Sequence, residues 1–312
     1  MGQRRDGRLR RDEQSGRRAC DGYYDASDIP FYYWLAQTFA ISDRHFCSLL
    51  GPTWPNRFYF YGASSWGNTQ TGDVSVLTNA AYQASVKLPQ LMEQAGRSWK
   101  IYKDGLLSFA TLFDPVKYLG LPMSQFDADV ANDALPDLSI LDPNFTGSGQ
   151  NDEHPPTDIQ KGQELTARVL STLLSHPAVW QKTVFILTYD EHGGYYDHVA
   201  PPEACEPDGE VPPDWRYDHL GVRVPLVVVS PFAKAGYVSH RVTDATSVTR
   251  FIENRFDLPA MTHRDANAWP MLDLFDFANP PFTTPPAGAP NATPSQAGLD
   301  WCASNPPGTG TP

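Results

Sequence analysis

The chain has 312 residues, 41% of them hydrophobic and 19% charged, which is enough to bury the core of one large domain. Its formal net charge of −12 argues against general nucleic-acid binding, because phosphate backbones require a basic surface. There is no run of about 18 apolar residues, so we expect no transmembrane segment. No signal peptide is visible either, since the N-terminus lacks an apolar core. The oligomeric state cannot be predicted.

The N-terminal segment differs in composition from the rest of the chain. Residues 1–18 hold seven Arg and three acidic residues, a net +4 that leaves −16 for the remainder. This composition predicts a disordered basic arm over residues 1–20. The alternative is a segment that contacts nucleic acid or anionic lipid.

The first half of the following domain reads as helices joined by irregular segments. Asp28-Ile29-Pro30 predicts a helix start, with Asp28 as the cap and Pro30 in the first turn. The sequence LLGPTWPNR then predicts a loop. Residues 85–96 predict a further helix that Gly96 ends, and residues 98–102 predict a strand.

The second half alternates helices with apolar strands. Residues 157–175 place leucines and a valine on one helical face. Residues 182–190 and 222–231 have continuously apolar centres, which is typical of strands buried on both faces. A helix over 247–256 follows. The pattern predicts an α/β fold with a mainly parallel sheet, in a domain over residues 21–279, and a Pro/Gly-rich tail over residues 280–312.

Two adjacent acids, Asp190 and Glu191, follow the first of these strands and precede Gly193-Gly194. Ligands of open α/β sheets bind at the carboxyl ends of strands. Carboxylates supply the oxygen ligands that hard divalent cations prefer, and glycines allow close approach. The pattern therefore predicts a metal site, with a solvated loop or a helix cap as the alternative.

The same segment carries a family resemblance. TYDEHGGYYDHVAPP is similar to the signature of the phosphoesterase family that includes bacterial phospholipases C, plant non-specific phospholipases C and certain acid phosphatases. The resemblance spans about Gly22 to Ala278. Further matching segments, in chain order, are DIPFYYWLAQTFAISDRHF, GPTWPNR, DEHPP, GVRVPLVVVSPFAKAGYVSH, DATSVTRFIENRF and LPAMTHRDANA.

The resemblance implies an alkaline-phosphatase-like α/β/α sandwich and a metal-dependent phosphoesterase. Thr53 matches the nucleophile, which needs activation because a neutral hydroxyl is a poor nucleophile. Asp190, Glu191 and Thr53 match the ligands of a divalent metal ion, for which Ca, Mg, Mn and Zn all stay open. His154 matches an active-site histidine that stabilises phosphoryl oxygens or protonates the leaving oxygen.

Three further residues are weaker candidates for substrate binding. Asn56 and Arg57 follow Thr53 and would hold its loop or contact phosphate. His198 lies near the acidic pair, where it would bind substrate or support a metal ligand. Each has a purely structural alternative.

The expected substrate is a phosphodiester such as a phospholipid headgroup linkage. The alternatives are a phosphomonoester, as in acid phosphatases, or a catalytically inactive family member. The family often is exported, which leaves the compartment open.

The family's opening strand, which ends in a motif similar to ENRSFDHYFG, has no match in this chain. We therefore expect the first strand to be missing and the metal's ligand set to be incomplete. The string Glu253-Asn254-Arg255-Phe256-Asp257 resembles that motif, but it falls in the amphipathic helix around 247–256, so we interpret it as structural.

Overall fold

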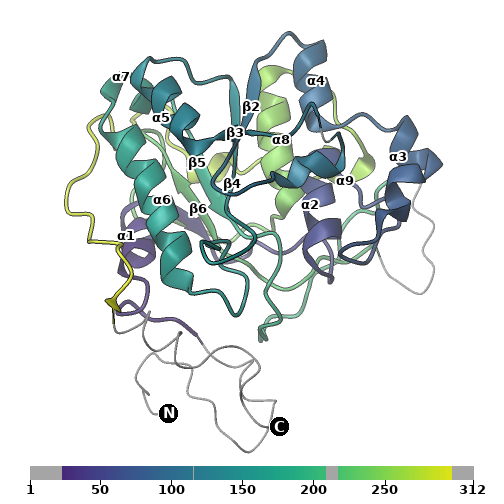
Figure 1. Cartoon of the computed structure of the whole chain (residues 1–312), viewed down its shortest axis with the longest axis horizontal. Helices are drawn as coiled ribbons and strands as arrows, with labels where there is room; N and C mark the ends of the chain where they lie inside the picture. Colours follow the sequence, from purple (N-terminus) through teal and green to yellow (C-terminus); the bar gives the residue numbers. More distant parts are fainter. Residues whose placement is uncertain (1–22, 115, 209–216, 297–312) are drawn as a thin grey trace, which may run out of the picture.

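The structure is a computed structural model that describes residues 23–114, 116–208 and 217–296 (Figure 1). The predicted basic arm at 1–20 and the last part of the predicted tail, 297–312, lie outside the described residues. No helix in the described ranges has the length and apolar character needed to cross a bilayer.

Helices and strands are interspersed along the chain, as in an α/β protein, although β5, β6 and β7 follow one another without an intervening helix among the described residues. The strands are β1 (Ala40–Ser42), β2 (Trp99–Lys103), β3 (Leu121–Pro122), β4 (Leu138–Asp142), β5 (Phe185–Thr188), β6 (Leu226–Val229) and β7 (Val238–Ser239). The helices are α1 (Pro30–Thr38), α2 (Thr53–Gly62), α3 (Ala80–Ala84), α4 (Leu88–Gln94), α5 (Met123–Ala131), α6 (Ile159–Leu174), α7 (Pro177–Trp180), α8 (Ala245–Phe256) and α9 (His263–Ala266).

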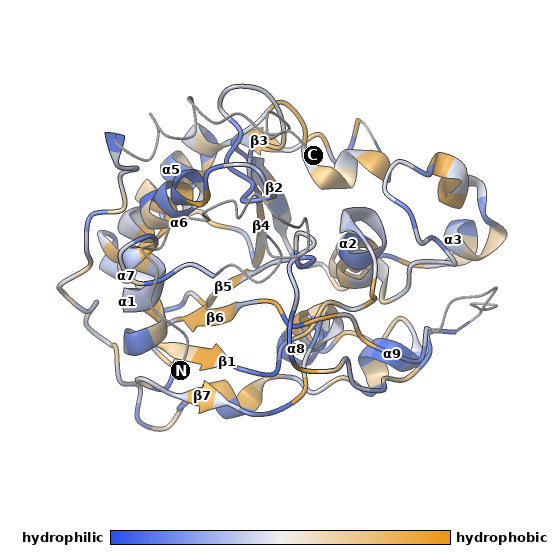
Figure 2. Cartoon of the chain, turned by 90° about the horizontal axis from the view of Figure 1, so that it is seen from below, coloured by the Kyte–Doolittle hydropathy of each residue, from blue (hydrophilic) through white to orange (hydrophobic). Residues whose placement is uncertain are grey.

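The described strands form two sheets. One has the order β5-β6-β1-β7, the other β3-β2-β4. Pairs β1–β7, β2–β3 and β2–β4 are parallel, whereas β1–β6 and β5–β6 are antiparallel. Helices α1, α5, α6 and α7 lie on one side of the strands, and α2, α8 and α9 lie on the other (Figure 2). This is a layered α/β arrangement whose sheet is divided between β4 and β5.

Helix α6 forms where the apolar periodicity predicts it. The Asp158 carboxylate caps it by accepting a hydrogen bond from the Gln160 backbone N–H at 2.9 Å. Val169, Leu170 and Leu173 are buried in the main core, where they meet the large buried side chain of Trp180. The predicted strands also form at 185–188 and 226–229.

Two local predictions at helix starts were wrong. The N-cap of α1 is Ile29 and not Asp28, because the Asp28 carboxylate instead accepts a hydrogen bond from the Asp25 backbone N–H at 3.0 Å. The predicted loop around Thr53 is in fact the start of α2. Pro55 is tolerated there, since backbone N–H groups in a first helical turn have no intrahelical partner.

Strand β5 is less buried than its composition predicts. All four residues of β6 are buried, but each residue of β5 is only half-buried. The reason is the division of the sheet, which leaves the outer edge of β5 along a cavity.

Part of the predicted tail is attached to the core. The Phe282 ring lies 4.6 Å from the ring of Phe39, and its carbonyl accepts a hydrogen bond from Trp180 Nε1 at 2.8 Å. Ser295 N donates to Gln160 on α6 at 2.8 Å. Residues 280–296 therefore cover the main core as irregular chain.

The string that resembles the family's opening motif lies in α8, as interpreted. Glu253 is fully buried, its Oε2 accepts from Arg250 at 3.2 Å, and its Oε1 is buried without a hydrogen-bond partner among the described residues. Burial, followed by the neighbouring Asp265, raises the pKa of Glu253 to about 9. The residue is thus a neutral core acid at neutral pH.

This pKa predicts a pH-dependent stability that Glu253→Gln removes. The neutral form is favoured in the folded state, so the stabilisation is full below about pH 4.5 and is lost as pH rises through about 9. Between pH 5 and 8 the free energy of unfolding of the wild type should fall by on the order of 4 kcal/mol because of this group. Urea unfolding between pH 5 and 8 measures this loss. If the free energy of unfolding of Glu253→Gln falls with pH as steeply as that of the wild type, Glu253 is not the group responsible.

Candidate active site

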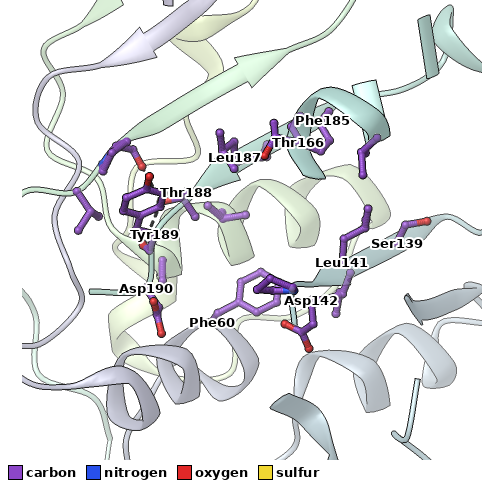
Figure 3. A pocket seen from close by; sticks show the side chains of 18 of the residues that line it. Phe60, Ser139, Leu141, Asp142, Thr166, Phe185, Leu187, Thr188, Tyr189 and Asp190 are labelled. Carbon is purple, nitrogen blue, oxygen red and sulfur yellow. Dashed lines mark hydrogen bonds between the residues drawn. The ribbon is translucent and has the colours of Figure 1, made fainter. Parts of the chain in front are cut away.

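The site lies where the carboxyl ends of β4 and β5 meet the first turns of α2. Asp142 is the last residue of β4, and Asp190 follows β5 by two positions. Both acids lie at the same end of the cavity between the two strands (Figure 3). Arg57 of α2 joins them, donating from Nε to Asp190 at 2.9 Å and from Nη1 to Asp142 at 2.8 Å.

Thr53 is the first residue of α2, one turn before Arg57. Side chains four residues apart lie on the same face of a helix. Thr53 therefore shares a face of α2 with Arg57, although Thr53 is not among the residues that line the cavity beside Asp190. It lies at a helix N-terminus, where backbone N–H groups and the helix dipole favour anions.

Asn56 fixes the loop that precedes Thr53. Its Oδ1 accepts from Leu49 N at 2.9 Å, and its Nδ2 donates to the carbonyls of Gly51 at 2.8 Å and Pro52 at 3.1 Å. The side chain is buried and its polar atoms are used by backbone. Of the two roles considered for Asn56, this geometry supports holding the loop.

Glu191 and His154 lie side by side. Glu191 is buried, accepts from Gly193 N at 2.7 Å, and has Oε1 3.5 Å from His154 Nε2. His154 Nδ1 is 2.7 Å from the carbonyl of Pro155, which can only accept. Both ring nitrogens thus face oxygen acceptors, and about half of the side chain is exposed. Such a ring can deliver a proton to a substrate oxygen.

Glu153 is a member of the site that the sequence pattern did not single out. Tyr32 and Tyr189 both donate hydrogen bonds to its carboxylate. Burial raises the pKa of Glu153 to about 7, against the lowering effect of those bonds. Its backbone adopts a left-handed φ of 60°, and Gly162 leaves the room for its side chain, since a Cβ there would lie 2.1 Å from Glu153 Cγ.

His192 joins this cluster, with Nδ1 3.6 Å from Glu191 Oε2, whereas His198 and His45 do not. The side chain of His198 is 80% exposed and lies 3.6 Å from Asp197, which is held by Arg223 at 2.7 Å. His45 is buried against Thr243, and burial lowers its pKa to about 3. His45 is therefore a neutral core residue.

The fit of a divalent metal ion is incomplete. Within residues 23–114, 116–208 and 217–296, no group of three His, Cys, Asp or Glu side chains is arranged to hold an ion. Asp190 is paired with Arg57, and Glu191 with the Gly193 backbone. Two carboxylates are fewer than the six or more ligands that Ca²⁺ or Mg²⁺ takes. These residues alone do not make a metal site.

Known proteins resemble this chain along most of its length. Phospholipase C B of Mycobacterium tuberculosis is 35% identical over 85% of the chain and 58% of its own length. Non-specific phospholipase C6 of Arabidopsis thaliana is 33% identical over 86% of the chain and 55% of its own. The chain thus spans somewhat more than half the length of these relatives.

A structural comparison identifies the fold. Murine ectonucleotide pyrophosphatase/phosphodiesterase 5 superposes with a TM-score of 0.51 at 11% identity, over 80% of this chain and 95% of that one. The fold is therefore the alkaline-phosphatase-like α/β fold that the sequence resemblance implied.

Residues 6–259 match the Phosphoesterase family, so the match begins inside the segment predicted as a basic arm. This chain belongs to the Phosphoesterase family.

Proposed function

We propose that the chain hydrolyses phosphodiesters in the manner of a phospholipase C, with Thr53 as the nucleophile. The observation that carries this proposal is the bridge from Arg57 to Asp190, which ties the helix bearing Thr53 to the acidic loop after β5. Family membership and relatives named phospholipase C support the same chemistry. Arg57 lies one turn beyond Thr53, where its remaining N–H groups can bind a phosphoryl oxygen.

The reaction would proceed in two displacements. The Thr53 hydroxyl gives its proton to solvent as its oxygen attacks phosphorus, and the bond from phosphorus to the leaving alcohol breaks. His154 gives its Nε2 proton to the alcohol oxygen. Water then attacks the phospho-threonine and gives a proton to His154 Nε2. The phosphate product leaves, and the Thr53 oxygen takes a proton from solvent to restore the hydroxyl. For murine ectonucleotide pyrophosphatase/phosphodiesterase 5, an inactive form with threonine changed to alanine is solved in complex with AMP, which supports a threonine nucleophile.

A paired-substrate assay tests the substrate class. A chromogenic phosphocholine diester should be turned over faster than the matching chromogenic phosphate monoester, because the reported relatives are phospholipases C. Faster turnover of the monoester would support an acid-phosphatase activity instead. No turnover of either, with Ca²⁺, Mg²⁺, Mn²⁺ or Zn²⁺ added, would support the inactive family member.

We further propose that Asp190 and Glu191, together with Thr53, are ligands of a divalent ion. Asp190→Asn with Glu191→Gln should then abolish metal retained per chain, measured by elemental analysis after dialysis. Asp104→Asn with Asp127→Asn is the control, since it removes two surface carboxylates around Arg168. Equal metal content in all three proteins would refute the ligand assignment.

A further inference from the structure

Four leucines near the candidate active site have exposed side chains. They are Leu106 (78% exposed), Leu107 (52%), Leu119 (45%) and Leu121 (39%). The first two lie in the loop after β2, and the other two lie just before β3 and in it. A Cβ at Gly120 would lie 3.3 Å from Ser108 Cβ, and Ser108 Oγ donates a hydrogen bond to the carbonyl of Tyr118. The two segments are thus in direct contact, and we name the four leucines the leucine patch.

The leucine patch is attached to the end of the sheet that carries the site. Asp104 N donates to the Asp142 carbonyl at 3.0 Å, and Phe109 N donates to Asp142 Oδ2 at 2.8 Å. The loop of residues 105–108 is therefore held at both ends by the same acid. Asp142, which also accepts from Arg57, lies at one end of the cavity (Figure 3). The patch thus stands at the rim of the candidate active site.

The segments that carry the patch have no net charge. Residues 103–122 contain two basic and two acidic residues, which are Lys103, Lys117, Asp104 and Asp114. Their charges cancel, whereas the whole chain carries −12. An acidic chain is repelled by an anionic surface. The charge distribution therefore favours a partner surface that is zwitterionic.

The chemistry of the exposed side chains favours a lipid surface over a protein partner. Exposed apolar patches mark contacts with proteins or with membranes. Protein interfaces depend mainly on aromatic and arginine anchors, and leucine is under-represented among their strongest contacts. Aliphatic side chains without a polar group suit the boundary between lipid headgroups and acyl chains. Lys103 Nζ donates to the carbonyl of Leu106, which places an ammonium group beside the patch, where it can stay at the level of the headgroups.

We propose that the leucine patch docks the chain on the surface of a phosphatidylcholine membrane, with Leu106 and Leu107 inserted below the headgroups. This inference rests on the proposed function, in which the substrate is a phospholipid. Docking through the rim would hold the cavity and Asp142 against the headgroup layer, which contains the ester to be cleaved. The chain would then meet its substrate at the membrane surface instead of drawing each lipid out into water.

Sedimentation with vesicles of pure phosphatidylcholine tests the docking. EDTA is present and no cation is added, so binding is measured without any need for turnover. The full chain should sediment with the vesicles. Leu106→Glu with Leu107→Glu should weaken this binding by at least about tenfold, because the burial of even one leucine is worth that factor. Circular dichroism confirms that the double variant folds.

Val74→Glu with Val242→Glu is the matched control. These two valines are also exposed, at 59% and 37%, and the substitutions add the same charge. Neither valine belongs to the patch or lines the cavity. The control should bind vesicles like the wild type. A second probe is Leu106→Trp, whose added fluorescence should be quenched by vesicles of brominated phosphatidylcholine.

Three outcomes would overturn the proposal. They are a wild type that stays free of the vesicles, equal binding by the two double variants, and a wild-type dimer that only the leucine substitutions dissociate, since the patch would then be a protein interface. Turnover of a soluble phosphodiester without vesicle binding would refute the docking and leave the proposed function intact. Vesicle binding without any turnover would support the docking and count against the proposed function.

Discussion

Thr53→Ala should lower turnover of a chromogenic phosphodiester by about 10³-fold or more, the size of effect seen when a covalent nucleophile is removed. The reason is the loss of the only protein atom in the proposed reaction that forms a bond to phosphorus. Alanine also suits a first helical turn, so folding should be unaffected. Initial rates with each of the four cations, together with circular dichroism, measure both effects.

Two variants sharpen this test. Thr71 is exposed, and its Oγ1 accepts from Trp54 N at 3.3 Å, next to Thr53 in the chain. Thr71→Ala removes a hydroxyl beside the proposed nucleophile and should keep wild-type turnover. Thr53→Ser keeps a hydroxyl and should retain measurable activity. The nucleophile assignment fails if Thr53→Ala turns over like the wild type, or if Thr71→Ala is the variant that loses activity.

The parts of the site that the sequence predicted are those with a local cause. Asp190 and Glu191 follow an apolar strand directly, and glycines follow them, so chain order alone places them at a strand end. Helix α6 likewise has its cap and its apolar face in one continuous stretch. Such features depend on neighbours within a few residues.

The parts that were missed depend on contacts between distant segments. Asp142 acquires its role from Arg57, 85 residues away. Glu153 is defined by two tyrosines, and Tyr32 precedes it by 121 positions. One signal was available for Asp142, because it ends the strand LSILD, and strand ends carry ligands in this fold class. The division of the sheet could not be read from any one segment, since it depends on which strands pair.

The contact between Arg57 and its two acids should also stabilise the fold. The Asp142 side chain is 3% exposed and that of Asp190 is 25% exposed, while Arg57 also stacks against Phe109 and Phe145. Removing one partner of a buried pair leaves charge without compensation. We expect Arg57→Ala to lower the free energy of unfolding by about 2–4 kcal/mol. This is less than the loss for a fully buried ion pair, because Asp190 is partly exposed to solvent.

Arg168→Ala is the matched control, because Arg168 also contacts two aspartates, Asp127 at 2.8 Å and Asp104 at 3.5 Å, but is 45% exposed. Arg168→Ala should lower the free energy of unfolding, measured in urea, by about 1 kcal/mol or less. Equal losses in the two variants would mean that burial does not distinguish the pairs. We expect the larger loss for Arg57→Ala, and we expect Arg57→Lys not to restore the stability. The reason is that one ammonium group cannot replace the two fixed donors that the planar guanidinium directs at separate strand ends.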